Sequence, residues 1–434
     1  MKQMRGNNKI GAKNWALLWV LGMAGQICWN VENSWFNTFV YQKIAKDPSI
    51  VAWMVGVSAA VSTLCTFLIG TWGDRIGKRK PFVWVGYILW GLFTIAFGLT
   101  EFLPKSPLFL AAAVVVCAAA VMSFFGSMGY DGAFNPWTTD ISNEQNRGKV
   151  GGALAVMPVL ATIFGAIVSG IIIDAIDFFA FFVIMGAFVG LIGLVALLFL
   201  QDSPSLTPQK RGGFWKQFGE VFSLSTIRGN HELFWVFAVM AVYFIGFNVY
   251  FPYITIFFTD YLGMSYSTTG VMQGVGLLAA ALLTIPAAGF IDKGKIPQII
   301  VAALVANIAG LLLVGLTGSN IITLLVGIFG AGIGYVLILQ TLTAWIKNLY
   351  PPSKRGQFEG IKQVFFVCIP MIFGPSIATF IINHFGSQVV QNGISGMVPN
   401  EKLFIFSAVF TLLTFVPLYF AARHFAKRQS RAGL

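Results

Sequence analysis

Charged side chains are scarce in this sequence. Asp, Glu, Lys and Arg make up 10% of its 434 residues, whereas soluble domains carry about 25%. The hydrophobic content of 57% and the mean hydropathy of +0.78 are typical of proteins embedded in a lipid bilayer. The composition therefore excludes a soluble globular protein and predicts an integral membrane protein.

Cysteine and histidine are also rare, with four and three residues. All four cysteines fall in apolar runs, where a thiol behaves as a small hydrophobe, and the histidines lie at the ends of such runs or in loops. The sequence shows no disulfide framework, metal-ligand cluster, nucleophile–base pair or phosphate-binding loop. We therefore expect no metal, no cofactor and no enzymatic activity.

Long apolar runs dominate what is present. Each is near or above the ~20 residues that a helix needs to cross the hydrocarbon core. We predict an all-α membrane protein with twelve transmembrane helices, at 15–40, 51–72, 81–103, 108–138, 150–173, 178–200, 233–259, 268–291, 299–316, 321–346, 360–383 and 403–422.

The net charge of +12 has an uneven distribution along the chain. Of the 28 Lys and Arg residues, 23 lie in the two tails and in alternate loops. The positive-inside rule then places both termini in the cytoplasm and accounts for the charge without a nucleic-acid partner. We expect a multi-pass protein of the plasma or inner membrane, working as a monomer.

A polar segment at 201–231 divides the predicted spans into six and six. We therefore predict an N-terminal six-helix bundle at 1–200, a cytoplasmic loop at 201–231 and a C-terminal six-helix bundle at 232–434, related by pseudo-symmetry. Short matches support an internal repeat, because Arg147-Gly148 and Arg355-Gly356 are each followed four residues later by another glycine.

The fourth span carries an ionisable residue, Asp131, inside an otherwise apolar run. An aspartate at the centre of a membrane helix costs roughly 2.5 to 3.5 kcal/mol, so it must be paired, protonated for part of a working cycle or facing water. Steps of four and three residues place other polar residues on the same stripe of the helix, which favours a cavity. These residues are Ser123, Ser127, Asn135 and Thr138.

The first span carries a second polar stripe, formed by Gln26, Asn30, Asn33 and Asn37. Such a stripe would be costly against lipid, so we expect it to line a cavity with Glu32 at its edge. Trp35 flanks the stripe, and its ring has two interpretations: core packing, or a stacking platform for the apolar face of a ligand.

The loop 70–80, GTWGDRIGKRK, is the most specific local signal. It contains Gly70, an aspartate four residues later, a basic residue, Gly77 and three further basic residues. This pattern resembles the signature loop between the second and third helices of the major facilitator superfamily. The resemblance implies two six-helix halves and a conformational switch formed by Gly70, Asp74, Arg75, Gly77 and Arg79, together with Arg147 and Arg355.

The second half contributes further polar residues to predicted spans. The candidates for substrate binding are Asn248, Tyr250, Tyr253, Gln340 and Gln363. Lys362 lies beside Gln363 and has two interpretations, a snorkelling or helix-pairing side chain and a member of an ion-coupling site.

Three blocks resemble the glycoside-pentoside-hexuronide:cation symporters, closest to their sucrose-carrier-like branch. They are YDGAFNPWTTDISNEQNRGKVGG from Tyr130, YFPYITIFFTDYLG from Tyr250, and the run from Gly332 to Pro370. In that family, acids on the first and fourth helices contact the sugar, which implies this role for Glu32 and Asp131. Sodium-using members also carry acids on the second helix, and this sequence has none there, which favours proton coupling.

The leading hypothesis is a proton-coupled symporter of a small polar solute, a sugar or glycoside, that works by alternating access. Asp131 and Lys362 would form its proton-coupling site. The alternative is a proton-coupled antiporter that exports a hydrophobic drug or metabolite, for which the aromatic content of 15% is the supporting feature.

Overall fold

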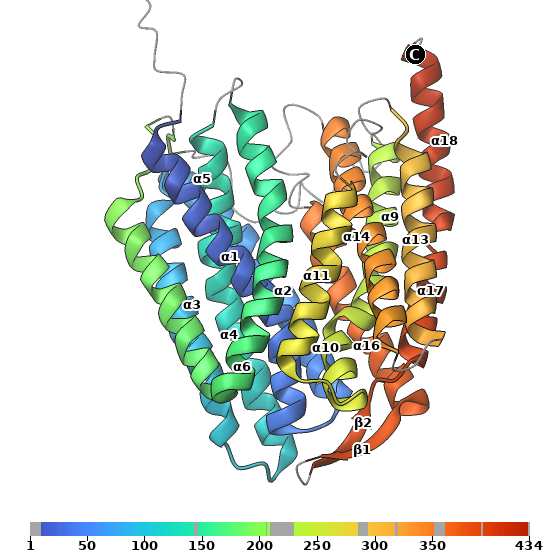
Figure 1. Cartoon of the computed structure of the whole chain (residues 1–434). Coiled ribbons are helices and arrows are strands. Elements are labelled where there is room, and N and C mark those ends of the chain that lie inside the picture. Colours follow the sequence, from blue (N-terminus) through green and yellow to red (C-terminus); the bar gives the residue numbers. More distant parts are fainter. Residues whose placement is uncertain are drawn as a thin grey trace, which may run out of the picture. The chain divides into compact units, whose positions relative to one another are not determined.

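The structure is a computed structural model that describes residues 10–142, 146–204, 206–208, 230–284, 294–316, 320–350, 361–391 and 394–432. Its regular structure is almost entirely helical (Figure 1). With the labels of Figure 1, the elements before residue 200 are α1 (Ala12–Phe39), η1 (Val40–Ile44), α2 (Pro48–Ile76), α3 (Lys80–Gly98), η2 (Leu99–Phe102), α4 (Leu108–Gly129), η3 (Tyr130–Phe134), α5 (Asn135–Asp140) and α6 (Arg147–Phe199).

The described elements after residue 230 are also mostly helices. They are α9 (His231–Tyr250), η4 (Phe251–Tyr253), α10 (Ile254–Ile256), η5 (Phe257–Tyr261), α11 (Tyr266–Thr284), α13 (Ile296–Leu316), α14 (Ile321–Leu349), η7 (Val364–Cys368), α16 (Ile369–Phe385), β1 (Ser387–Gln391), β2 (Ile394–Val398), α17 (Lys402–Leu412) and α18 (Phe415–Ala432). The antiparallel pair β1–β2, with Ser387 opposite Val398, is an addition to the predicted all-α fold.

Ten stretches among the described helices are long and apolar enough to cross a membrane. One of them, Lys149–Phe199, has 51 residues and is interrupted at Asp177, where a φ of 67° breaks the helix. This interruption lies between the predicted fifth and sixth spans. α1 has 28 residues and is not one of the ten, because the polar residues between Gln26 and Asn37 lower its hydropathy.

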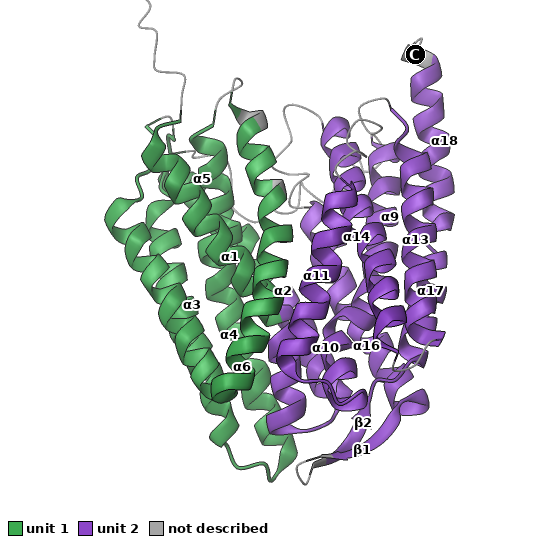
Figure 2. Cartoon of the chain, viewed as in Figure 1, with its two compact units in different colours: residues 1–32, 60–214 green, residues 33–59, 215–434 purple. Residues whose placement is uncertain are grey.

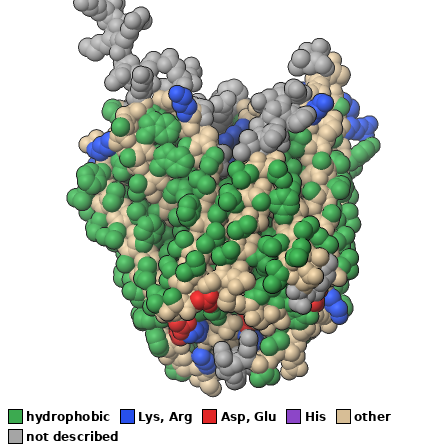
Figure 3. Space-filling view, viewed as in Figure 1, with side chains coloured by type: hydrophobic (Ala, Val, Ile, Leu, Met, Phe, Trp, Pro, Cys, Tyr) green, Lys and Arg blue, Asp and Glu red, His purple; other side chains and the backbone are tan. Residues whose placement is uncertain are grey.

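The surface of these helices is apolar. Large hydrophobic side chains such as Phe109, Leu198 and Leu316 are exposed. On the face shown in Figure 3, hydrophobic side chains cover the broad middle, and charged side chains lie toward the two ends. A surface of this kind is stable against lipid and not against water.

Packing divides the chain into two compact units (Figure 2). Unit 1 comprises Met1–Glu32 and Ala60–Phe214, and unit 2 comprises Asn33–Ala59 and Trp215–Leu434. The boundary falls inside α1 and α2. The segment 33–59, which precedes the predicted boundary between the two bundles by more than 100 residues, therefore packs with the second half of the sequence.

Small residues allow the helices of unit 1 to approach closely. A Cβ atom at Gly86 of α3 would lie 2.4 Å from the backbone nitrogen of Gly129 on α4. On another face of α3, a Cβ at Gly91 would lie 2.3 Å from the carbonyl oxygen of Gly186 on α6. Contacts of this kind drive association between membrane helices, where lipid is as apolar as the side chains.

Unit 2 combines a close glycine contact with a large apolar core. The core includes Phe237, Leu304, Leu342 and Trp345, all fully buried, from α9, α13 and α14. α13 and α14 meet at Gly310, where an added Cβ would lie 2.2 Å from the backbone nitrogen of Ala331.

We expect Gly310→Ala to lower the apparent melting temperature of the purified protein. Alanine is favoured over glycine in a helix by about 1 kcal/mol, but forcing a methyl group into a packed backbone contact costs about 1 to 3 kcal/mol. Gly190→Ala on α6 is the matched control, because a Cβ there meets no atom within 4 Å. Equal melting temperatures for the two variants would contradict close packing at Gly310.

Candidate functional site

Asp131 lies in a π-helical turn, η3, that joins α4 to α5. Pro136 follows this turn by two residues and has no N–H group to donate to the carbonyl of residue 132, which favours a local change of hydrogen-bond register. The same spacing recurs in unit 2, where Pro370 follows the π-helical turn η7. π-helical turns occur frequently at functional sites.

Two neighbours on the same stripe bind the Asp131 carboxylate. The Ser127 hydroxyl donates to Oδ2 at 3.2 Å, and the Asn135 side-chain amide donates to Oδ1 at 3.4 Å. Steps of four residues in the sequence thus become a line of contacting polar side chains. Thr138, the last member of the predicted stripe, donates instead to the backbone carbonyl of Asn135 at 2.7 Å.

Glu32 joins this line from α1. The Ser123 hydroxyl donates to its Oε1 atom, while its Oε2 atom is buried and accepts no hydrogen bond from the described residues. One residue before Asp131, the hydroxyl of Tyr130 accepts a 2.7 Å hydrogen bond from Gln26 of α1. We call this set the α1–α4 polar cluster, and its members are Gln26, Glu32, Ser123, Ser127, Tyr130, Asp131 and Asn135.

The chemistry of the cluster is that of two carboxylates held by neutral donors. Among the described residues of unit 1, no Lys or Arg forms an ion pair with either acid, so hydroxyl and amide groups supply their hydrogen bonds. Such acids can accept hydrogen bonds from the hydroxyl groups of a solute or can take up a proton. No group of three or more potential metal ligands occurs in the described part of the chain.

The other stripe residues of α1 divide between the two units. Asn30 lies beside Gly165 of α6 in unit 1, because a Cβ at Gly165 would be 2.5 Å from its Oδ1 atom. Asn33, Trp35 and Asn37 belong to unit 2. There Asn37 is fully buried and donates to the Asn33 carbonyl at 2.8 Å, and Trp35 is 1% exposed, with its ring edge-on to Tyr266. The structure thus places Trp35 in a packed core.

The candidate binding residues of the second half also differ in environment. Asn248 is buried and donates to the Phe244 carbonyl within α9 at 2.8 Å. The fully buried Tyr253 donates its hydroxyl to the carbonyl of Pro48 at 3.0 Å. Tyr250 is buried against Phe247. Gln340 is exposed, and Gln363 is half-buried.

Lys362 lies at the edge of an aromatic cluster in unit 2. Its Nζ atom is 5.9 Å from the ring centroid of Phe366. Phe366 packs edge-on against Phe244, and Phe247 stacks on Tyr335 with centroids 4.8 Å apart. Lys362 belongs to unit 2 and Asp131 to unit 1, so the two members of the predicted coupling site lie in different units.

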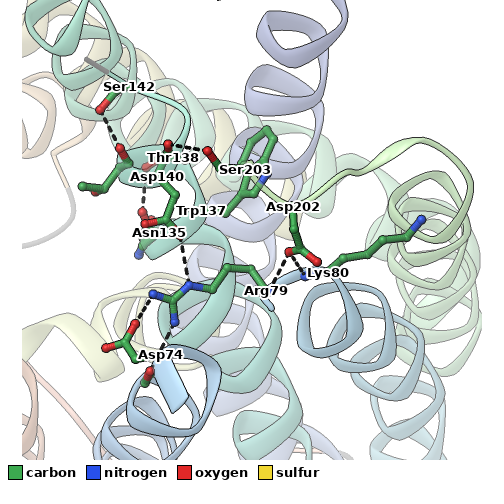
Figure 4. Close-up of polar contacts among 12 residues, drawn as sticks. Asp74, Arg79, Lys80, Asn135, Trp137, Thr138, Asp140, Ser142, Asp202 and Ser203 are labelled. Atoms are coloured by element: carbon green, nitrogen blue, oxygen red, sulfur yellow. Dashed lines mark hydrogen bonds and ion pairs between the residues drawn. The ribbon is translucent and has the colours of Figure 1, made fainter. Parts of the chain in front are cut away.

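The predicted switch loop is built around Arg79 (Figure 4). α2 continues through Ile76, so Asp74 lies in its last helical turn and not in the loop. The buried guanidinium of Arg79 contacts three groups: its Nη2 atom pairs with Asp74, its Nε atom donates to Asp140 at 3.1 Å, and its Nη1 atom donates to the Gly70 carbonyl at 3.2 Å. Arg79 thus links the ends of α2 and α5.

Asp202 completes this arrangement from the start of the predicted inter-bundle loop. Its Oδ1 atom accepts from the backbone nitrogens of Arg79 and Lys80, at 2.7 and 2.8 Å, and so caps the N-terminus of α3 (Figure 4). Next to it, the Ser203 hydroxyl donates to the Asp140 carbonyl at 2.9 Å. Neither Asp202 nor Ser203 was among the predicted site residues, although an acid after a span is a frequent capping residue.

The remaining switch residues have distinct roles in the fold. Gly77 has a φ of +66°, which favours glycine and makes the turn after α2 possible. An added Cβ at Gly70 would meet only the Gly132 carbonyl, at 4.0 Å. Arg75 is exposed. The side chain of Arg147 and all of Arg355 lie outside the described residues.

A buried ion pair in unit 2, between Lys46 and Asp260, was also not predicted from the sequence. Lys46 precedes α2, and Asp260 lies in the π-helical turn η5. Each residue is unusual in the sequence. Lys46 is one of the few basic residues outside the tails and the basic loops, and Asp260 directly follows the predicted span 233–259. Their pairing across 214 residues carried no local signal.

Comparison with known families assigns this architecture. The model of the Major Facilitator Superfamily matches residues 18–265 and 236–433, which together cover nearly the whole chain. The chain belongs to the Major Facilitator Superfamily. It is therefore a multi-pass membrane transporter and not an enzyme.

Solved structures of other superfamily members share the fold. A variant of the nucleoside transporter NupG superposes with a TM-score of 0.74 at 12% identity, over 94% of this chain and 99% of that one. A bacterial homolog of the human lysosomal transporter Spinster, inward-facing and unoccupied, gives 0.70 at 17% identity, over 96% and 98%. No curated protein sequence matches the chain.

We expect Arg79→Lys to lower the stability of this superfamily member and its transport rate. An ammonium group cannot reach Asp74, Asp140 and the Gly70 carbonyl together, and each hydrogen bond to a charged group is worth about 1.5 to 3 kcal/mol. The measurements are the apparent melting temperature and the rate of substrate counterflow. Arg423→Lys makes the same change at an exposed position on α18, and an equal effect there would contradict a special role for Arg79.

Proposed function

We propose that this member of the superfamily is a secondary active transporter that couples proton movement to symport of a small polar solute, a sugar or glycoside. The observation that carries the proposal is the α1–α4 polar cluster, in which two acids on apolar helices are bound by hydroxyl and amide donors and by no cation of the described unit 1. An acid in a membrane helix is costly and is retained for function.

The proposal includes twelve spans with both termini in the cytoplasm, in the plasma or inner membrane. Twelve spans follow if α1 crosses the membrane and if the break at Asp177 separates two crossings. The concentration of Lys and Arg in the tails and alternate loops supports the orientation. We further propose a monomer that works by alternating access.

Polar groups on α1 and α5 support a polar substrate. Gln26, Glu32 and Asn135 offer amide and carboxylate groups that match the hydroxyl groups of a sugar. The resemblance of three sequence blocks to the sucrose-carrier-like symporters supports the same class. Nucleosides contain a sugar as well, and they belong in a substrate test because NupG, a nucleoside transporter, shares the fold.

Asp131 is our proposed proton-coupling residue. Its carboxylate has only neutral hydrogen-bond donors around it, Ser127 and Asn135, so gain or loss of a proton changes the charge of the site without breaking an ion pair. We further propose that Lys362 of unit 2 takes part in the coupling, as the fixed positive charge that a bound cation would otherwise supply. The lack of acids in the membrane-spanning part of α2 supports a proton over sodium.

The second candidate is a proton-coupled antiporter that exports a hydrophobic drug or metabolite. The aromatic cluster of unit 2, with Phe244, Phe247, Tyr335 and Phe366 in mutual contact, favours this candidate, since such rings bind apolar surfaces.

Transport in proteoliposomes separates the two candidates. Purified protein is reconstituted and presented with radiolabelled sugars, glycosides, nucleosides and hydrophobic cations, with and without a pH gradient. Accumulation of a sugar or glycoside driven by an inward proton gradient supports symport. Gradient-driven movement of a hydrophobic cation in the opposite direction to protons supports the antiporter and overturns the leading proposal.

We expect Asp131→Asn to abolish accumulation driven by a pH gradient while exchange of substrate across the membrane continues. Asparagine keeps polar contacts with Ser127 and Asn135 but cannot exchange a proton. The measurement compares gradient-driven uptake with counterflow in the same vesicles. Retained accumulation against a gradient would contradict the assignment. Asp174→Asn, at an exposed acid on α6, is the control and should leave both activities unchanged.

We expect Glu32→Gln to weaken binding of the transported sugar by about ten- to a hundredfold, because a hydrogen bond to a charged group is worth about 1.5 to 3 kcal/mol. The glutamine Oε1 atom can still accept the Ser123 hydrogen bond, so the fold should persist. Isothermal titration of the purified variant measures the change, with its melting temperature as a check of folding. An unchanged binding isotherm would reduce Glu32 to a contact between helices.

A further inference from the structure

The ion pair between Lys46 and Asp260 is withdrawn from solvent. The side chains are 1% and 0% exposed. The Asp260 carboxylate also accepts hydrogen bonds from neutral donors. Gln42 donates to both of its oxygens at 2.9 Å, and the Thr259 hydroxyl donates to Oδ2 at 3.0 Å. All four residues belong to unit 2.

The β1–β2 hairpin covers this pair. A Cβ atom at Gly396 of β2 would lie 2.2 Å from the carbonyl oxygen of Lys46, so the strand lies directly on the backbone of the lysine. The hairpin is anchored beside it, because Asn400 donates to the Phe385 carbonyl at 2.8 Å and Tyr261 donates to both carboxylate oxygens of Glu401, at 2.9 and 2.8 Å. Both strands also contact η5, the turn that carries Asp260.

A second tie lies two residues after Lys46. The carbonyl of Pro48 accepts hydrogen bonds from the hydroxyl groups of Tyr253, at 3.0 Å, and Thr379, at 3.1 Å. The start of α2 is thus held by η4 and α16, while Lys46, two residues earlier, is held by η5. Every contact joins the segment 33–59 to elements that lie more than 200 residues later in the sequence.

We propose that Lys46, Asp260 and the covering hairpin form a latch that holds the segment 33–59 on the rest of unit 2. The latch must break for the transporter to open at the end that carries the hairpin. This inference rests on the proposed alternating-access function. Opening needs water to reach both charges, and the hairpin blocks that access, so the pair and the hairpin release together. Removing one charge leaves the other buried and unpaired, which strongly destabilises the closed arrangement.

Reactivity of a single cysteine at position 38 tests the latch. Thr38 is fully buried in the segment 33–59, so Thr38→Cys reports release of this segment. The four native cysteines are first replaced by serine or alanine, and the purified protein is labelled in detergent with a water-soluble thiol reagent. Because this readout needs neither a substrate nor a membrane orientation, it stays informative even if the proposed substrate class fails.

We expect Lys46→Met and Asp260→Asn each to raise the labelling rate by about tenfold or more. The double variant Lys46→Met with Asp260→Asn should label as slowly as the unmodified pair, because it leaves no buried charge and keeps an amide oxygen to accept from Gln42. Cooperative thermal unfolding of each single variant, measured on the same preparation, excludes general unfolding. Gly396→Val should raise the rate without changing either charge, by displacing the hairpin from Lys46.

Lys402→Met is the matched control, since Lys402 lies beside the hairpin but is exposed. It should label at the rate of the parent. Parent-like labelling of both Lys46→Met and Asp260→Asn would overturn the latch, as would Lys402→Met labelling as fast as Lys46→Met.

Discussion

The cost of a charge in hydrocarbon organises this structure. An ionisable side chain within a membrane helix costs roughly 2.5 to 3.5 kcal/mol or more unless other groups stabilise it, so each such residue fixes its neighbours. Asp131 and Glu32 accept hydrogen bonds from hydroxyl groups of α4 and from an amide group of α5. Asp260 meets Lys46, and Arg79 meets Asp74 and Asp140. The apolar helices carry these few polar contacts and are positioned by them.

The polar contacts fall into two kinds with different consequences. Neutral donors around Asp131 and Glu32 allow the charge of these acids to change while their hydrogen bonds persist. Full ion pairs at Lys46 and Arg79 resist change, because loss of one partner leaves the other charge without compensation. In a transporter, the first kind suits a site that binds and releases ligands, and the second suits the places where the chain must hold one conformation and then release it as a whole.

Periodicity and composition predicted the helical membrane fold and the polar stripe through Ser127, Asp131 and Asn135, because residues four apart on a helix must lie together. For Trp35 and Tyr253, which are predicted to bind substrate, the structure shows side chains in the packed interior, and their role in binding stays a prediction. Residue type alone cannot distinguish an aromatic ring that faces a ligand from one that faces another helix. The pairing of Lys46 with Asp260 could not be predicted, since the two residues are 214 residues apart.

The hairpin and the π-helical turns were missed for different reasons. The dipeptide Asn392-Gly393 is a frequent hairpin signal, but it lies outside the apolar runs on which the span predictions depend. The π-helical turns contain ordinary residues, and only the prolines at 136 and 370 hint at two of them. A π-helical turn contains one more residue than an α-helical turn, and one residue corresponds to a rotation of about 100°. The helix that carries Asp131 therefore contains one extra residue at this turn. Migration of the π-helical turn along the helix would rotate a side chain to another face without breaking or translating the whole helix.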